Sequence, residues 1–340
     1  MQTKKRISIK DIADAAGVSH PTVSRALRGE GRMSGQTRSR IVALAQEMGY
    51  TPSLVARGLV TQRSHSVGLV VTSFVDPFHS EVAQGVEDEA RRRGYSLFLA
   101  STGVDALREL EVVDDFQGRQ VDGIIVSSSR VGNQYRGLLK EIGIPIVLIN
   151  THADGENVHS IYHDDYHGGR QLMQHLLDRG YRRIAYLGNR RAGRADSERE
   201  RAWVDAMHAV ELDPALTVKG PNGRLHGGAA GAELLLRQAN DLWNSPPEAI
   251  YCYNDTVAIG AASVLRRNGL RVPSDVALTG FDDIDVAAYV DPPLTTLHQP
   301  RTEMGALAMR LMLALLDDNR HPPVNQTTIL QGTLVVRESS

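Results

Sequence analysis

The N-terminal fold is decided by residues 9–27, which read Ile-Lys-Asp-Ile-Ala-Asp-Ala-Ala-Gly-Val-Ser-His-Pro-Thr-Val-Ser-Arg-Ala-Leu. Just before them, Ser8 has Asp11 three residues later, which is the spacing of a capping box that opens a helix. That helix is expected to end at Gly17, and a second helix begins after Ser19. The inward-facing residues would be Ile12, Ala15, Ala16, Val23, Ala26 and Leu27. Two short helices joined by a tight glycine turn predict a helix-turn-helix.

The second helix of such a motif presents its N-terminal residues to base edges in the major groove of DNA. Arg25 can donate two hydrogen bonds to guanine O6 and N7, the commonest specific contact. His20 can donate or accept, whereas Pro21 has no backbone donor and would at most touch a thymine methyl. Ser19 and Thr22 are placed to contact phosphate or to cap the helix. A three-helix module with another role is the alternative.

A third helix is expected from Ser34, with an apolar stripe formed by Ile41, Leu44, Ala45 and Met48. Residues 51–63 follow it, and Ser53 could cap one short helix there. Isolated helices below ~12 residues rarely persist, and Gly58 weakens this one further. We therefore expect a hinge that is disordered in the free protein and folds on DNA. A plain interdomain linker is the alternative.

The run from Ile9 to Leu27 resembles the DNA-binding head of the lactose-repressor/galactose-repressor (LacI) family. Ala16-Gly-Val-Ser19 and Thr22-Val-Ser-Arg25 match the family signature, and the resemblance extends over essentially the whole chain. It implies that Leu59 wedges into the minor groove at the operator centre and kinks the duplex. The candidate DNA contacts are Ser19, His20, Pro21, Thr22, Arg25, Arg57 and Leu59.

Charge is distributed unevenly along the 340 residues, although the formal net charge is only −2. Residues 1–63 hold 11 Lys and Arg against 4 Asp and Glu, a balance of +7, and the rest hold 27 against 36, a balance of −9. A small basic head on a larger acidic body indicates a polyanion-binding module attached to a different domain. The helical pattern of the head argues against a merely solvated basic tail.

The composition is that of a globular protein, and no apolar run reaches the ~18 residues that a membrane span needs. The basic start at residues 1–6 leads into no apolar segment, so we expect no secretory signal. Cys252, the single cysteine, lies in an apolar run and is expected to be a buried hydrophobe. These features fit a reducing cytoplasm.

From Ser66 onward, apolar runs alternate with helical patterns. The candidate strands are Val67–Thr72, Leu97–Ala100, Gly123–Val126, Ile144–Ile149, Ile184–Leu187, Ile250–Tyr253 and Val276–Phe281. The helical segments include Glu81–Arg93, Gly169–Arg179, Ala258–Asn268 and Met304–Leu316. This alternation predicts an α/β fold with parallel sheets covered on both faces. There are too many strands for one small sheet, so we expect two doubly wound lobes.

The expected domains are a helix-turn-helix domain over 1–50, a hinge over 51–63 and an effector-binding core over 64–340. Within the core, we expect the first lobe at about 64–163 plus 297–322 and the second at about 164–296 plus 323–340. Ligands of such sheets bind outside the carboxyl ends of the strands. After the first strand, Asp76 and Pro77 suit the start of a helix, which leaves Phe78 and His79 at the cleft. Other strands end in Ser127–Ser129, Asn150, Asn254-Asp255 and Gly280–Asp283.

The family resemblance implies an effector pocket built like that of a periplasmic sugar-binding protein. Arg199 matches an arginine four residues before an aromatic residue, and Asn254 matches the asparagine of an Asn-Asp element. Asp282 matches the first aspartate of a Gly-aromatic-Asp-Asp turn. Asn150 lies where some members use aspartate, and His226 where some stack an aromatic ring, across a length difference. The candidate effector contacts are Phe78, His79, Ser127, Asn150, Arg199, His226, Asn254 and Asp282.

These residue types suit a polyhydroxylated ligand, because carboxylates accept hydroxyl protons, arginine donates several and amides do both. The aromatic content is only 5%, which favours a sugar over a nucleobase that needs ring stacking. Structural alternatives remain for each residue type. Asp282 and Arg199 could form an interlobe ion pair, Asp255 and Asp283 could cap helices or turns, and Trp203 could belong to the core.

Motifs of hydrolases, phosphate-loop enzymes and zinc proteases are missing from the sequence. Gly227, Gly228 and Gly231 match a dinucleotide fingerprint only weakly. His152, His159, His163 and His167 lie near Asp164 and Asp165, which could suggest a metal site. However, residues 164–168 resemble a family segment that opens a helix. We therefore expect no enzyme, no cofactor and no metal.

The sequence thus predicts a cytoplasmic transcription regulator, most simply a repressor, that binds a pseudo-palindromic operator. The family resemblance implies that tetrameric members carry a C-terminal leucine heptad, and residues 333–340 contain none, so we expect a homodimer rather than a coiled-coil tetramer. The expected effector is a sugar or sugar derivative in the interlobe cleft. The alternatives are a nucleobase or nucleoside, or a protein co-repressor, on the same fold, and more remotely an enzyme. A secreted sugar-binding protein would share the body but would lack the basic head.

Overall fold

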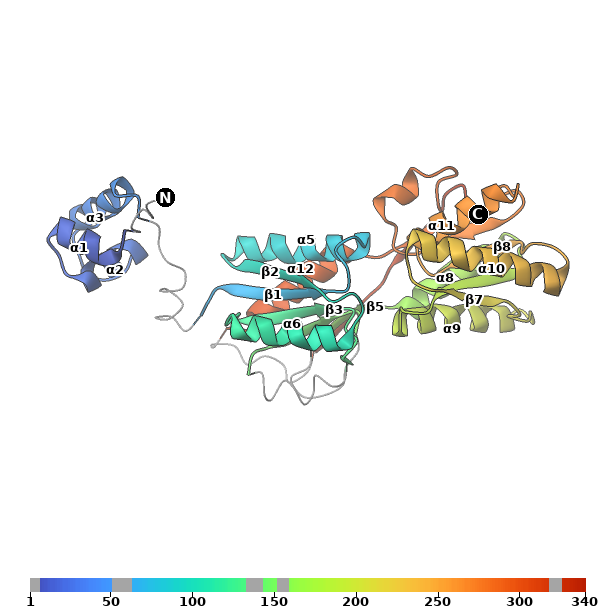
Figure 1. The fold of residues 1–340 in the computed structure, drawn as a ribbon, viewed down its shortest axis with the longest axis horizontal. Coiled ribbons are helices and arrows are strands. Elements are labelled where there is room, and N and C mark those ends of the chain that lie inside the picture. Colours follow the sequence, from blue (N-terminus) through green and yellow to red (C-terminus); the bar gives the residue numbers. More distant parts are fainter. Residues whose placement is uncertain (1–6, 51–62, 133–142, 152–158, 318–325) are drawn as a thin grey trace, which may run out of the picture. The chain divides into compact units, whose positions relative to one another are not determined.

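The computed structural model describes residues 7–50, 63–132, 143–151, 159–317 and 326–340. Contacts divide the chain into two units, Met1–Ser64 and His65–Ser340, which are described separately. Figure 1 shows their elements in chain order. None of the helices within the described ranges is long and apolar enough to cross a membrane.

The N-terminal unit is a three-helix module formed by α1 (Ile9–Ala16), α2 (His20–Arg28) and α3 (Gly35–Glu47). The predicted capping box of α1 is present, because Ser8 and Asp11 bond each other's backbone N–H. Gly17 ends α1 with a φ of 65°, a left-handed conformation that glycine adopts without strain. The core holds Ile12, Ala13, Ala16, Val23, Ala26, Ile41 and Ala45. Packing of all three helices around this core fixes the outer face of α2.

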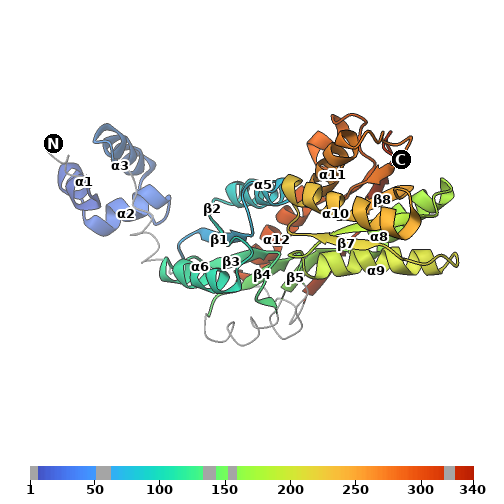
Figure 2. The ribbon, with the colours of Figure 1, turned by 45° about the vertical axis from the view of Figure 1, so that its right-hand side comes forward.

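The first lobe of the larger unit is a parallel sheet of six strands in the order β11-β5-β4-β3-β1-β2. Its strands are β1 (Ser66–Val71), β2 (Ser96–Ser101), β3 (Gly123–Ser127), β4 (Ile146–Ile149), β5 (His159–His163) and β11 (Gln326–Leu330). Helices α5 (Pro77–Arg92) and α12 (Arg301–Leu315) pack on one face and α6 (Ala106–Gly118) on the other, as Figures 1 and 2 show. Both faces of the central strands are therefore buried, as their continuous apolar runs predicted.

The second lobe is a parallel sheet of four strands in the order β7-β6-β8-β9. The strands are β6 (Ile184–Asn189), β7 (Thr217–Gly220), β8 (Ala249–Cys252) and β9 (Ala277–Thr279). Helices α10 (Leu225–Trp243) and α11 (Asp255–Arg267) cover one face, and α8 (Asp165–Asp178) and α9 (Arg194–His208) cover the other. A 3-10 turn, η2 (Asp285–Ala288), follows β9. Cys252 and Trp203 are core residues of this lobe, as predicted.

The two lobes are joined near Asp164, Gln299 and Gln331, where the chain passes from one sheet to the other. Strands β10 (Thr296–His298) and β12 (Thr333–Val335) pair with each other beside α8. The prediction that residues 323–340 all belong to the second lobe was wrong. Strand β11 registers in parallel against β5, which places residues 326–330 in the first sheet.

Two glycines explain how closely the covering helices approach each other. A Cβ on Gly85 would lie 2.0 Å from the Thr302 carbonyl oxygen, and one on Gly228 would lie 2.2 Å from that of Val257. The first position brings α5 against α12, and the second brings α10 against α11. Gly228, one of the glycines that weakly matched a dinucleotide motif, therefore serves helix packing.

Candidate functional site

The outer face of α2 is the candidate DNA-reading surface. Ser19, His20, Pro21 and Arg25 are exposed, and Thr22 is half-buried. The Ser19 and Thr22 hydroxyls pair with each other at 2.8 Å, and Ser19 makes no side-chain cap to the backbone. Of the two roles considered for Ser19, the capping role is therefore absent from this structure.

Arg25 extends from α2 with its Nε donating to the Pro21 carbonyl oxygen at 3.3 Å. Gly31 lies beside it, because a Cβ there would come within 3.1 Å of the Arg25 Cδ. No carboxylate among the described residues pairs with Arg25, so its terminal nitrogens remain available to donate. Arg57 and Leu59, the other predicted DNA contacts, lie outside the described residues.

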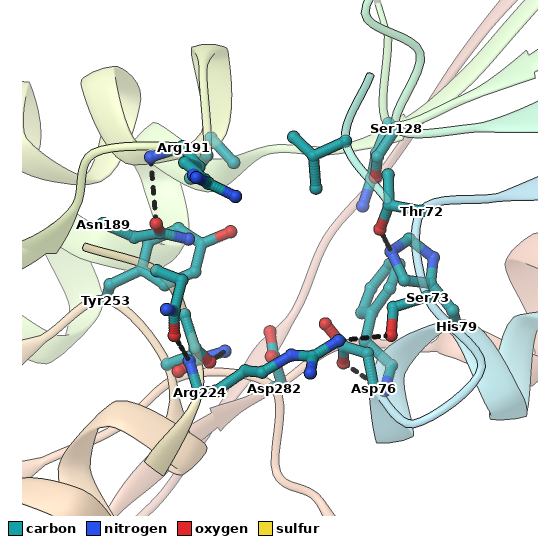
Figure 3. Close-up of a pocket in the computed structure, with 18 of the residues that line it drawn as sticks. Thr72, Ser73, Asp76, His79, Ser128, Asn189, Arg191, Arg224, Tyr253 and Asp282 are labelled. Carbon is teal, nitrogen blue, oxygen red and sulfur yellow. Dashed lines mark hydrogen bonds between the residues drawn. The ribbon is translucent and has the colours of Figure 1, made fainter. Parts of the chain in front are cut away.

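A cavity of about 440 Å³ lies between the two lobes of the larger unit. Its residues follow strand ends in both sheets, with Thr72 after β1, Asn150 after β4 and Asn189 at the end of β6. Tyr253 and Asp282 come from the ends of β8 and β9. The cavity therefore lies at the carboxyl ends of parallel strands, the place that ligands of such sheets occupy. Figure 3 shows Thr72, Asn189, Tyr253 and Asp282 around the open space.

Most of the predicted effector contacts line this cavity. Those that do are Phe78, His79, Asn150, Arg199, His226, Asn254 and Asp282. Ser127 does not line it, which corrects the prediction. Ser127 is the last residue of β3 and is buried behind the wall, where its hydroxyl lies 3.2 Å from the His79 Nδ1. The chain turns at Ser128, with a φ of 57°, so that Ser128 and Ser129 reach the cavity instead.

The first-lobe wall contains a chain of hydrogen-bonded groups. The His79 Nε2 lies 2.6 Å from the Thr72 hydroxyl, which Figure 3 also shows. Asp76 caps α5 by accepting the Phe78 N–H at 3.0 Å. Burial lowers the pKa of His79, so its ring is neutral at physiological pH. This wall offers the cavity fixed hydroxyl and aromatic groups.

Two predicted contacts in the second lobe are already bound to other protein groups. Arg199 pairs with Asp165 at 2.7 Å and donates to the Tyr253 carbonyl oxygen at 2.6 Å. Asn254 caps α11 by accepting the Val257 N–H and donates to the Gly223 carbonyl oxygen. The ion pair of Arg199 is thus within one lobe, not between lobes as the alternative considered. These two residues shape the wall before any ligand arrives.

Asp282 is the buried carboxyl group of the cavity, with only 5% of its surface exposed. One oxygen accepts a hydrogen bond from the Gln299 Nε2 at 2.6 Å, and the Arg199 Nη1 lies 3.9 Å away. Burial raises the pKa of Asp282 to about 7, although the charges of Arg199 and Arg301 lower it. Near neutral pH this group can therefore either accept or donate a hydrogen bond to a ligand hydroxyl.

The sequence reasoning missed several arginines of the cavity. Arg130, Arg191, Arg194 and Arg224 all line it. Each follows a strand end, so the same rule that selected Asn150 could have found Arg130 and Arg191. Arg224 follows β7, a short strand containing Lys219 that was not predicted. No group of residues that could hold a metal ion occurs within the described ranges.

Two regions of the chain match known protein families. Residues 8–53 match the family described as bacterial regulatory proteins, lacI family. Residues 173–340 match the periplasmic binding protein-like domain. The chain is 32% identical over 336 residues to the ribose operon repressor of Haemophilus influenzae, covering 98% of both chains. The chain belongs to the LacI family.

Other similar proteins agree with this assignment. The transcriptional repressor PurR of Aliivibrio fischeri is 31% identical to this LacI-family chain over 336 residues, covering 98% of each. Among solved structures, the lac repressor dimer bound to operator and the anti-inducer ONPF superposes with a TM-score of 0.86. It is 24% identical and covers 98% of this chain and 99% of its own, so it supports the fold alone.

A regulator named CelR, solved as a cellobiose complex, is 30% identical to this chain. It superposes with a TM-score of 0.73 over 98% of this chain and 100% of its own. The named relatives are transcriptional repressors and none is named an enzyme. This LacI-family protein is therefore a DNA-binding transcriptional repressor rather than an enzyme, with a helix-turn-helix head and a periplasmic-binding-protein-like core.

Proposed function

We propose that this repressor reads a pseudo-palindromic operator as a homodimer and that a polyhydroxylated effector in the interlobe cavity controls its affinity for the operator. The observation that carries the proposal is the cavity itself, whose walls come from both lobes. A ligand that contacts both walls binds one interlobe angle better than another, and only such differential binding can shift an equilibrium. The readout is the affinity of the head for DNA.

The proposed DNA contacts are Ser19, His20, Pro21, Thr22 and Arg25 on the head, with Arg57 and Leu59 in the hinge. Phosphate contacts position the protein, and base contacts select the sequence. Arg25 is the proposed base-reading residue because it is exposed and lacks a carboxylate partner among the described residues. Binding to operator DNA would place the protein in the cytoplasm.

The proposed effector contacts are Phe78, His79, Asn150, Arg199, His226, Asn254 and Asp282. Hydroxyl groups suit this lining because it alternates donors with acceptors, and Phe78 offers an apolar ring edge beside them. The ribose operon repressor and the CelR–cellobiose complex favour a sugar by name. PurR, the other named relative, makes a purine the second candidate. The ring of Tyr253 is the group that would stack on it.

A binding assay on the full-length protein tests this function. Selection from randomised DNA would first yield an operator, which we expect to have two half-sites related by inversion. Fluorescence anisotropy on that operator would then be repeated with neutral sugars, sugar acids, sugar phosphates and purines. We expect one class to change the operator affinity. A protein that selects no DNA sequence, or whose operator affinity responds to no small molecule, contradicts the proposal.

A further inference from the structure

Four arginines line the interlobe cavity without a carboxylate partner in the described part of the chain. These residues, called here the cavity arginines, are Arg130, Arg191, Arg194 and Arg224. Arg130 follows β3 in the first lobe, Arg191 and Arg194 lie after β6, and Arg224 precedes α10. None of them forms a salt bridge with any carboxylate of the described residues. The positive charge therefore comes from both lobes.

Several arginines elsewhere on the core are paired with carboxylates. On the outer surface, Arg108 pairs with Glu111, Arg267 with Glu233, and several others pair likewise; further examples are Arg91, Arg201 and Arg271. In the cavity, the Arg224 Nη2 donates at 2.8 Å to the neutral hydroxyl of Ser73, as Figure 3 shows. The Arg194 guanidinium lies 4.8 Å from the ring centre of Tyr162. Neither contact neutralises a positive charge.

Arg130 is the most confined of the four. One of its terminal nitrogens donates to the Arg191 carbonyl oxygen across the cleft, whereas its buried Nε has no hydrogen-bond partner. Glu109, a nearby carboxylate, binds the Ser129 hydroxyl and the Arg130 backbone N–H instead of the guanidinium. Burial lowers the pKa of Arg130. An unsatisfied buried donor is costly, and an anion is the group that best satisfies a guanidinium.

The carboxylates that line the cavity do not balance this charge. Five arginines line it, counting Arg199, against two aspartates, Asp76 and Asp282. Asp165 offsets Arg199 from outside the lining, and the cavity arginines remain. Arg130 is partly buried, and a neutral sugar would leave the excess positive charge of the lining without a counter-ion. A negatively charged group on the ligand would supply that counter-ion.

We propose that the effector is an anion: a polyhydroxylated molecule with a carboxylate or phosphate group that Arg130 of the first lobe and arginines of the second lobe hold together. The inference rests on the proposed function and names the chemical class of its ligand. Guanidinium forks match carboxylate and phosphate oxygens in geometry as well as charge. Because the arginines come from both lobes, the anion draws the lobes together and favours one interlobe angle.

Isothermal titration calorimetry of the full-length protein with matched ligands tests the charge. The panel is glucose, glucuronate and glucose 6-phosphate, then ribose and ribose 5-phosphate, with inorganic phosphate alone. We expect at least one acidic member of the panel to bind about tenfold or more tightly than its neutral parent, because hydrogen bonds between charged groups are stronger than those to neutral ones. Its affinity should fall as salt is added. The acidic members that bind distinguish a sugar acid from a sugar phosphate.

Variants of the cavity arginines test which of these residues bind the acidic group of the ligand. Arg130→Gln should lower the affinity for the acidic ligand about tenfold to a hundredfold and should change the affinity for a neutral sugar little. Arg191→Gln, at an exposed position, should weaken it by a smaller factor and gives a second variant that does not disturb the interior. Arg190→Gln is the matched control, because Arg190 is exposed, adjacent in sequence and outside the lining, and it should leave binding unchanged.

The inference is overturned if a neutral sugar binds as tightly as its acidic counterpart, if no acidic member binds, or if Arg130→Gln binds the acidic ligand like the parent. Measurements of operator binding distinguish failure of this inference from failure of the proposed function. A neutral sugar or purine that changes operator affinity would overturn the anionic effector and leave the proposed function standing. Failure of the protein to select an operator would contradict the proposed function whatever the cavity binds.

Discussion

The DNA-reading face of α2 and the interlobe cavity achieve recognition in opposite ways. On α2 the candidate contacts lie within seven consecutive residues, Ser19 to Arg25, and are mostly exposed. In the cavity they lie in segments that follow six strands of two sheets, and several already hold structural bonds. Arg199 and Asn254 are examples of such committed residues. The comparison teaches that a surface reader can leave a charged group such as Arg25 without an ionic partner among the described residues, whereas a buried pocket must satisfy most of its polar groups internally.

The largest expected effect comes from replacing Arg199, a cavity residue that is already bound to other protein groups. Arg199→Ala would leave the buried Asp165 without its partner, and removing one member of a buried ion pair costs about 3–5 kcal/mol. We expect the free energy of unfolding in urea to fall by about that amount. Arg237→Ala, at an exposed arginine bonded only within its own helix, is the control and should change it little. An unchanged free energy of unfolding would contradict the structural role of Arg199.

A smaller effect is expected from the DNA-reading face. Arg25→Ala should cost about 1–3 kcal/mol of operator affinity and relax the preference at one base position. Stability should change little, because Arg25 is exposed. Binding selection on randomised DNA measures both the affinity and the preference. An unchanged base preference would remove Arg25 from the set of base-reading residues.

Replacing Asp282 should change effector binding in the cavity but not operator binding by the head. Asp282→Asn keeps the shape of the side chain and tolerates the φ of 108° better than a larger residue would. It removes a charged acceptor, so effector affinity should fall about tenfold to a hundredfold. Operator affinity without effector should match the parent. Calorimetry and an operator gel shift on the same preparation measure the two affinities, and lost operator binding would mark Asp282 as structural.

The smallest expected effect is a pH dependence of stability. A folded-state pKa of about 7 at Asp282 exceeds the ordinary value for an aspartate. The folded protein thus keeps a proton that the unfolded chain loses between about pH 4 and about pH 7, so stability falls as pH rises through that window. Relative to the parent, Asp282→Asn should gain stability from about pH 5 to about pH 8. Thermal unfolding of both proteins at the two pH values checks this, and a constant difference would refute the raised pKa.

The sequence alone was sufficient to predict features formed by residues that lie near one another in the chain. The capping box, the three helices of the head and the seven candidate strands all correspond to observed elements, because each depends on residues near one another in the chain. It was not sufficient for β5, a buried strand that begins with His159 and Ser160. Polar residues in a buried strand hide the pattern that identifies such strands.

The cavity shows the same limit. Asn150 and Asp282 could be selected because strand-end position and family resemblance both indicated them, and both line the cavity. Ser127 was wrong because one residue of strand register decides whether a side chain faces the cavity or the interior. The strand-end rule could have selected Arg130 and Arg191, but no local pattern shows that the cavity arginines gather where two lobes meet.

The most direct test of the account is operator affinity measured with and without the panel compound that binds the parent most tightly. The measurement uses fluorescence anisotropy on the parent protein, Arg130→Gln and Arg190→Gln. We predict equal operator affinity for all three without the compound, and a change with the compound that Arg130→Gln loses and Arg190→Gln keeps. An unchanged response in Arg130→Gln, or operator binding lost without any ligand, would contradict the control of the DNA-reading head by an anion in the cavity.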